Sequence, residues 1–198
     1  MPDSSFHLLA VSGSVSARSA TRTAIDHLAQ LVRGSGCSVD ILDLYDEPLE
    51  VFSPETTYGS PGYPALRERV GRADGIVVGT PDYHGSMSGA AKNFLDHFWT
   101  EFAGKLFGSI VASYEKGLTV TDQIRTVARQ CYAWSMPYGV ALQDKADVKD
   151  GEIVSDAFRE RLEMFARDLC VYGGLLSTQR AADLAGAEPG FMARYRNQ

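Results

Sequence analysis

Short apolar runs alternate with amphipathic stretches along the whole of this 198-residue chain. Because a strand that is covered on both faces is apolar at nearly every position, each run reads as a buried strand of a parallel sheet. The predicted strands are residues 6–12, 39–43, 75–80, 108–113 and 138–142.

Between these runs, apolar residues recur at intervals of three and four, the spacing that lines one face of an α-helix. The clearest sets are Thr21, Ile25, Leu28 and Val32; Val120, Ile124, Val127, Cys131 and Trp134; and Phe158, Leu162, Phe165, Leu169 and Tyr172. Thr119 is the predicted N-cap of the second of these helices. Shorter helices are predicted at residues 66–73 and 90–98. Residues 175–198 show little pattern, and we expect them to cover a surface or a neighbouring subunit.

Five strands that alternate with five helices predict an α/β three-layer sandwich with a parallel sheet at its centre. The length fits one domain over residues 1–198. A flavodoxin-like strand order 2-1-3-4-5 is the best match, and its order reverses between the first and third strands. Open sheets of this kind bind ligands at that point, beyond the carboxyl ends of the strands.

Composition and charge exclude several classes of function. Hydrophobic residues make up 44% of the chain, which is ordinary for a globular protein. The net charge of −6 argues against a nucleic-acid groove or an anionic membrane surface as partner. No apolar run is long enough to cross a bilayer, and the N-terminus lacks a signal-peptide pattern, so we expect a cytoplasmic protein. Cys37, Cys131 and Cys170 are widely spaced and read as reduced thiols in the core, and no metal site is predicted.

The loop after the first predicted strand, residues 12–21, is rich in hydroxyl groups. Free N–H groups at the start of the following helix attract an anion, and Arg18 can add charge-assisted hydrogen bonds. The loop matches neither a dinucleotide-binding glycine motif nor a P-loop, so it predicts a site for the terminal phosphate of a larger ligand. The alternative is that Ser19 or Thr21 only caps the helix and that Arg18 is solvated.

The loop after the third predicted strand, residues 81–89, suits a flat ligand that forms hydrogen bonds. Tyr83 offers a ring face and a hydroxyl, and two serines add donors. Gly85 and Gly89 allow the backbone to approach a ligand closely. This arrangement favours the edge of a planar heterocycle such as an isoalloxazine ring.

A third loop, residues 113–117, follows the fourth predicted strand and points to the same edge of the sheet. Its Lys116 can face the ring or a phosphate, or remain solvated. Three residues of the second loop also have alternatives, because His84 can be a simple turn residue, Tyr83 a packing residue and Asp82 a surface carboxylate.

Residues 13–21, followed by residues 80–96, resemble the NADPH-dependent FMN reductase family, which includes flavodoxin-like flavin, quinone, azo-dye and chromate reductases. The resemblance covers roughly residues 6–172. It implies that the first loop holds the FMN phosphate, the second the ribityl chain and the ring, and the third the ring edge. The residues that it implicates in cofactor binding are Ser14, Ser16, Arg18, Ser19, Ala20, Thr21, Pro81, Asp82, Tyr83, His84, Gly85, Ser86, Ser113, Tyr114, Lys116 and Gly117.

Two positions depart from the family pattern. The family usually has arginine where this chain has Ser16, and here the arginine comes two residues later, at Arg18. The third loop is often rich in glycine, whereas residues 114–116 are Tyr-Glu-Lys. We therefore expect the phosphate charge to be met from a different angle and the ring edge to be more crowded.

The resemblance implies an oxidoreductase that takes a hydride from NADPH or NADH onto FMN and passes it to a quinone, flavin, azo, nitro or metal-ion acceptor. The cofactor does the chemistry, so no catalytic side chain is predicted. Family members pair as homodimers or homotetramers, and the apolar residues Phe94, Phe98, Trp99 and Phe102 are consistent with a subunit contact. The alternatives are a flavodoxin-type one-electron carrier and a flavin-binding sensor without turnover.

Overall fold

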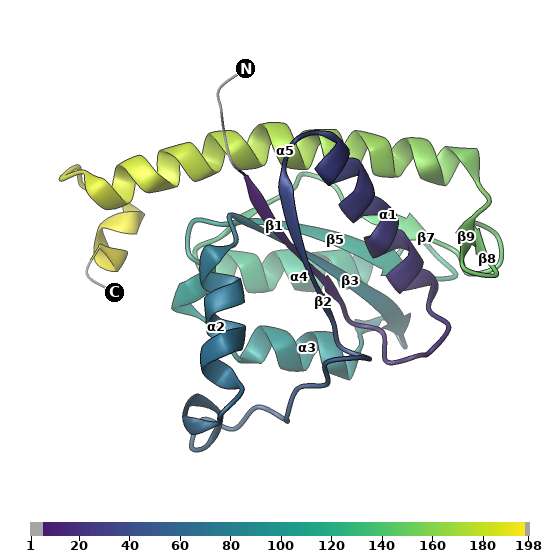
Figure 1. The fold of residues 1–198 in the computed structure, drawn as a ribbon, viewed down its shortest axis with the longest axis horizontal. Coiled ribbons are helices and arrows are strands. Elements are labelled where there is room, and N and C mark those ends of the chain that lie inside the picture. Colours follow the sequence, from purple (N-terminus) through teal and green to yellow (C-terminus); the bar gives the residue numbers. More distant parts are fainter. Residues whose placement is uncertain (1–5, 197–198) are drawn as a thin grey trace.

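The computed structural model describes residues 6–196 and has a parallel sheet at its centre (Figure 1). Its strands lie in the order β2-β1-β3-β5-β6, with β7 also paired to β5, which is the predicted flavodoxin-like order. The strands are β1 His7–Ser12, β2 Ser38–Asp43, β3 Gly75–Tyr83, β4 Ser86–Met87, β5 Leu106–Ala112, β6 Trp134–Ser135, β7 Val140–Leu142, β8 Val148–Lys149 and β9 Glu152–Ile153. The predicted fifth strand, residues 138–142, corresponds to β7, and β6 is a further short strand that pairs in parallel with the start of β5.

Helices cover both faces of the sheet and bury their apolar stripes against it. α1 and α5 lie on one face, and α2, α3 and α4 lie on the other (Figure 1). Alternate residues of β1 serve the two cores, with Leu8 packed towards α1 and Leu9 towards α2. The α-helices are α1 Ala20–Gly34, α2 Tyr63–Arg72, α3 Gly89–Asp96, α4 Leu118–Gln130 and α5 Asp156–Ala185, and the 3-10 helices are η1 Thr57–Gly59, η2 Thr100–Phe102 and η3 Phe191–Tyr195.

Three predictions about the helices are wrong in detail. Thr119 lies inside α4, whose N-cap is Gly117 in a left-handed conformation. Trp134 is not on α4, because the helix ends at Gln130 and Trp134 begins β6 with half of its surface exposed. Tyr172 points outwards because Gly173 takes the inward position, where an added Cβ would stand 2.4 Å from the ring of Phe6.

The predicted patternless tail is mostly helical. α5 continues to Ala185, past the sheet, and η3 turns back beneath the end of this helix (Figure 1). Met192 of η3 is buried, and Arg180 of α5 donates a hydrogen bond of 2.9 Å to the carbonyl of Ala103. The tail therefore covers the surface of its own chain at the start of β5, while residues 197 and 198 lie outside the described range.

The aromatic residues that follow α3 belong to the core and not to a subunit surface. Phe94, Phe98 and Phe102 are almost fully buried, and their rings lie 5.6–6.2 Å apart. Only Trp99 of the predicted contact set is exposed, with 61% of its surface accessible. The prediction that all four residues form a subunit contact is therefore wrong for three of them.

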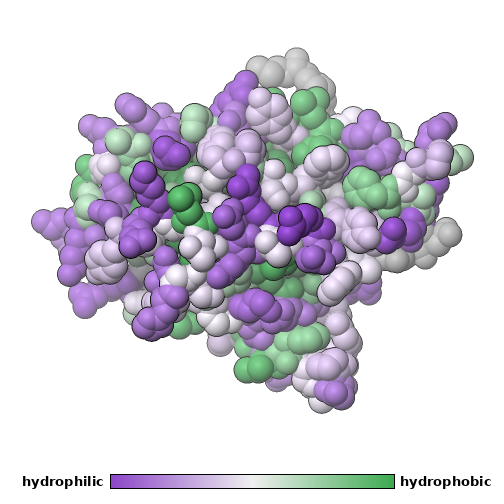
Figure 2. Space-filling model, turned by 180° about the vertical axis from the view of Figure 1, so that it is seen from behind, coloured by the Kyte–Doolittle hydropathy of each residue, from purple (hydrophilic) through white to green (hydrophobic). Residues whose placement is uncertain are grey.

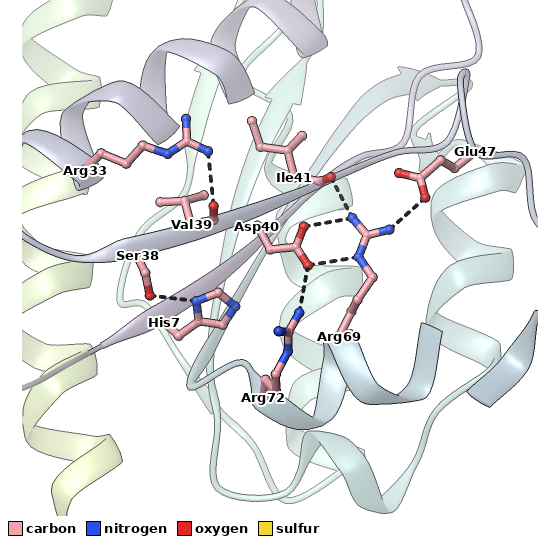
Figure 3. Close-up of polar contacts among 9 residues, drawn as sticks. All are labelled: His7, Arg33, Ser38, Val39, Asp40, Ile41, Glu47, Arg69 and Arg72. Carbon is pink, nitrogen blue, oxygen red and sulfur yellow. Dashed lines mark hydrogen bonds and ion pairs between the residues drawn. The ribbon is translucent and has the colours of Figure 1, made fainter. Parts of the chain in front are cut away.

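The edge strand β2 is clamped to α2 by charged residues (Figure 3). Arg69 of α2 donates two hydrogen bonds of 2.9 Å to the carboxylate of Asp40, and further ones to the carbonyl of Ile41 and to Glu47. The hydrogen bonds from Arg69 hold the pKa of the Asp40 carboxyl below its usual value. This clamp fixes the strand that borders β1, and β1 carries the first candidate loop at its end.

None of the helices within residues 6–196 combines the length and the apolar character that crossing a membrane requires.

Candidate functional site at the carboxyl ends of β1, β3 and β5

A crevice of about 220 Å³ lies where β1, β3 and β5 end. The three loops that were expected to share a ligand all contribute to its walls, as does the segment after β7. Its lining residues are Ser14, Ser16, Arg18, Ser19, Ala20, Thr21, Pro81, Asp82, Tyr83, Ala112, Ser113, Tyr114 and Asp144.

The first two loops are joined at the floor of the site. The hydroxyl of Ser88 donates a hydrogen bond of 2.6 Å to the carbonyl of Gly13, and it also caps α3 by accepting from the N–H of Ala91. The N–H of Gly13 donates to the carbonyl of Gly79 at 2.7 Å. A Cβ at Gly13 would stand 2.7 Å from the Cβ of Ala91, so this close approach needs glycine. The loops after β1 and β3 therefore form one connected wall.

The loop after β1 presents donors to the crevice. Ser19 is the N-cap of α1, accepting from the N–H of Arg22 at 3.2 Å, so the capping alternative holds for that hydroxyl. The N–H groups of Ala20 and Thr21 still have no partner within the helix, because the first turn of an α-helix cannot satisfy them. Ser14 is buried, whereas Arg18 is exposed and forms no ion pair with any residue from 6 to 196.

The next arginine along the chain is engaged elsewhere. Arg22 forms an ion pair with Asp43 at the end of β2, and its guanidinium lies 4.9 Å from the centre of the Tyr45 ring. The hydrogen bond to Asp43 raises the pKa of Arg22 above its ordinary value. Arg18 is therefore the guanidinium that this loop leaves available for an anionic ligand.

Part of the predicted loop 81–89 is a β-hairpin. β3 runs on to Tyr83, and the chain returns as β4 after a two-residue turn in which both His84 and Gly85 have positive φ. Oδ1 of Asp82 accepts a hydrogen bond of 2.8 Å from the N–H of Gly85 and closes the turn. His84 is the turn residue that the alternative interpretation named.

The far side of this hairpin rests on α4. The side-chain oxygen of Gln123 accepts from the hydroxyl of Ser86 and from the N–H of Met87, and its amide nitrogen donates to the carbonyl of Gly85. Ser86 thus bonds to α4, and neither it nor His84 or Gly85 is among the residues that line the crevice.

The third loop is held to the hairpin and to the segment after β7. The hydroxyl of Ser113 donates to Oδ2 of Asp82 at 2.9 Å and accepts from the N–H of Glu115. Gln143 donates to the carbonyl of Tyr114 at 2.7 Å, and Tyr114 itself is 87% exposed. An adjoining cavity of about 780 Å³ is lined by the remaining residues of this loop, including Lys116 and Gly117.

Sequence reasoning missed four residues at this site. Ala112 and Asp144 line the crevice, and Gln123 and Gln143 support its walls. Asp144 could have been found, because it follows the carboxyl end of the fifth strand, where such sheets place ligand contacts. The two glutamines carry no signal in the sequence, since their partners lie 29–38 positions away.

Residues 6–147 match the sequence profile of NADPH-dependent FMN reductases. The NADPH azoreductase of Bacillus sp. (strain OY1-2) is 29% identical over 154 residues, which cover 76% of this chain and 83% of that protein. The FMN-dependent NADPH-azoreductase of Staphylococcus haemolyticus (strain JCSC1435) is 27% identical over 169 residues, covering 79% of this chain and 89% of that protein.

Solved structures share the fold at lower identity. The apo form of the NADH:FMN oxidoreductase EMOB superposes with a TM-score of 0.70 at 19% identity, over 84% of this chain and 89% of that one. An archaeal flavodoxin superposes with a TM-score of 0.61 at 13% identity, over 85% of this chain and 99% of that one.

Proposed function

The chain belongs to the NADPH-dependent FMN reductase family, and we propose that it binds FMN in the crevice and uses it to pass electrons from NAD(P)H to a planar azo or quinone acceptor. The family consists of NAD(P)H-linked oxidoreductases, so the chain is an enzyme of this type. When bound, FMN supplies two-electron transfer between the nucleotide and the acceptor. The tasks of the chain are to hold the cofactor, to orient it and to leave room for the second substrate.

One observation carries this proposal. The loops after β1 and β3 are joined by the Ser88–Gly13 hydrogen bond, and together they open a crevice instead of filling it. The donor set of the first loop fits a phosphate monoester, because hydroxyls, free amide groups at a helix start and one uncommitted guanidinium all meet there.

Two exposed tyrosines flank the crevice. Tyr83 has 51% and Tyr114 has 87% of its surface accessible, although each lines the same cavity. An aromatic ring that is left in water gains free energy when it packs on another flat ring. We assign these two residues to the isoalloxazine and to the substrate that packs on it.

The azo and quinone acceptors are proposed from the names of the relatives and from the flat, aromatic character of these walls. A planar acceptor can take the place that the nicotinamide leaves, which makes turnover a cycle of two alternating substrates. A panel of azo dyes, quinones, free flavin, nitro compounds and ferric chelates tests the assignment. Faster reduction of a non-planar chelate than of any dye or quinone would contradict it.

The experiment that tests FMN binding is direct. Purified protein is expected to be yellow and to release FMN when it is denatured, and mixing it with NADPH in a stopped-flow instrument should bleach the flavin rapidly and fully. Slow, incomplete bleaching would instead support a flavodoxin-type carrier or a sensor. Colourless protein that fails to bind added FMN would contradict the site itself.

We also propose that the chain, residues 1–198, acts as one FMN-binding unit that assembles as a homodimer or homotetramer. On the side of the molecule drawn in Figure 2, hydrophobic residues form separate patches among hydrophilic ones. Light scattering during size-exclusion chromatography measures the assembly, and a monomer at micromolar concentration would contradict it.

A further inference from the structure

A second and larger cavity, of about 1000 Å³, lies beside the crevice. One of its walls is the start of α1 with the loop before it, and the other is the segment 144–151, which includes part of the β8–β9 hairpin. Figure 1 shows this hairpin next to the first turn of α1. The two cavities share Ser16, Arg18, Ser19, Ala20 and Asp144, so a ligand in the crevice borders the larger space.

The larger cavity has more positive than negative side chains in its walls. The positive side chains in its walls are those of Arg18, Arg22, Lys145 and Lys149, and the negative ones are those of Asp144 and Asp150. Arg22 is already paired with Asp43. Neither lysine forms an ion pair in the part of the chain that the structure describes, so folding leaves their charges free for a ligand.

The β8–β9 hairpin and the segment just before it hold the backbone of the two lysines in place. Val148 and Ile153 pair across the hairpin and are buried in the core that α1 and α5 share. Lys149 comes next along the strand and is therefore turned to solvent. The N–H of Lys145 donates to the carbonyl of Val148 at 2.8 Å, which fixes the backbone of the other lysine.

We propose that this cavity holds a phosphate group of the nicotinamide nucleotide, with Lys145 and Lys149 as its cationic contacts. The inference rests on the proposed function. FMN carries one phosphate, for which the loop after β1 already offers hydroxyls and amide groups. NAD(P)H carries two phosphates in its pyrophosphate, and NADPH has a third at the 2′ position. Flexible ammonium groups suit such a mobile anion, because they bind phosphate as point charges without a required orientation.

The test compares the wild-type holoenzyme with a double variant that carries both Lys145→Gln and Lys149→Gln. Isothermal titration with oxidised NADP+ or NAD+ measures nucleotide binding without turnover. We expect the dissociation constant of at least one nucleotide to rise about tenfold, the scale of one lost hydrogen bond between charged groups, while FMN affinity stays unchanged. Lys149→Glu should weaken binding further. Lys92→Gln is the matched control, because Lys92 lies on α3 and pairs with Asp96.

Each outcome has one meaning. A loss confined to NADP+ assigns the site to the 2′-phosphate, and an equal loss for both nucleotides assigns it to the pyrophosphate. Unchanged nucleotide affinity in both the double variant and Lys149→Glu would overturn the proposal. It would also be overturned if these variants lost affinity for FMN and kept their affinity for the nucleotides. Failure of the wild type to bind FMN would be recorded separately by flavin titration, and it would contradict the proposed function and not the lysine contacts.

Discussion

The carboxylate of Asp82 accepts a hydrogen bond of 2.9 Å from the hydroxyl of Ser113, and its other oxygen closes the turn of the hairpin at Gly85. One side chain thus sets the positions of two of the three loops that surround the crevice. Because Ser113 and the hairpin residue Tyr83 both line the crevice, a change at Asp82 should disturb the site more than the fold.

Asp82→Ala leaves two donors without an acceptor, and we expect the affinity for FMN to fall about tenfold, with a loss of roughly 1–2 kcal/mol in the free energy of unfolding. Asp82→Asn retains one oxygen and should give a smaller effect. Fluorescence titration of FMN and urea unfolding measure the two quantities. If Asp82→Ala lowered stability but left FMN affinity unchanged, Asp82 would not position the site.

Arg18→Ala is expected to weaken FMN binding by about 10- to 100-fold, the scale of a hydrogen bond between charged groups. Its melting temperature should not change, since Arg18 is exposed and forms no ion pair in the described part of the chain. Arg161→Ala, at an exposed position on α5, is the control for the loss of one positive charge. Equal FMN affinity in the two variants would place the phosphate elsewhere.

Gly13→Ala should destabilise the protein by about 1–3 kcal/mol, because the new Cβ would press on Ala91 and on the carbonyl of Gly79. Gly89→Ala is the matched control, since nothing lies within 4 Å of a Cβ there. Thermal unfolding compares the two variants. Equal melting temperatures would show that the wall formed by the two loops can move apart without cost.

Much of the fold follows from local pattern, whereas the walls of the site depend on distant contacts. Four residues spaced by three and four, from Thr21 to Val32, are all buried on α1 as predicted. The hairpin after β3 was missed because Pro81 and two glycines indicate a loop, while its pairing rests on Gln123 of α4. The second half of α5 was missed because none of its residues beyond Gly174 is buried, so no apolar stripe marks it.

The contribution of the Arg69–Asp40 ion pair to the free energy of unfolding should depend on pH. Arg69 lowers the pKa of Asp40 in the folded state, so the stabilisation is present above the unfolded-state pKa, near 3.8, and is lost as the pH falls through the folded-state value. Asp40→Asn should cost about 1 kcal/mol at neutral pH, and the difference from wild type should shrink as the pH falls from 6 to about 3. Urea unfolding at several pH values measures this difference. A gap that stayed constant would mean that the Asp40 charge contributes nothing.

Lys105 gives a slope of the same sign at higher pH. Its side chain is fully buried at the start of β5 and donates to the carbonyls of Gly71 and Ala73 at the end of α2, and burial lowers its pKa from 10.5 to about 7. The folded protein therefore releases the Lys105 proton near neutral pH, whereas the unfolded chain keeps it until about pH 10.5. Since the unfolded state binds more protons across this window, the contribution of Lys105 to stability should rise as the pH rises from 7 towards 10.

Lys105→Met removes this titration, and it also leaves two carbonyls without their donor, so its absolute stability is not the informative quantity. The expected result is a difference in unfolding free energy between wild type and Lys105→Met that grows in favour of wild type between pH 7 and pH 9.5. Lys116→Met, at an exposed position in the third loop, controls for the change in net charge and should show no such trend. A difference that stayed flat with pH would mean that Lys105 keeps its proton in the folded protein, with the two carbonyls at the end of α2 sufficient to hold the charged ammonium in the core.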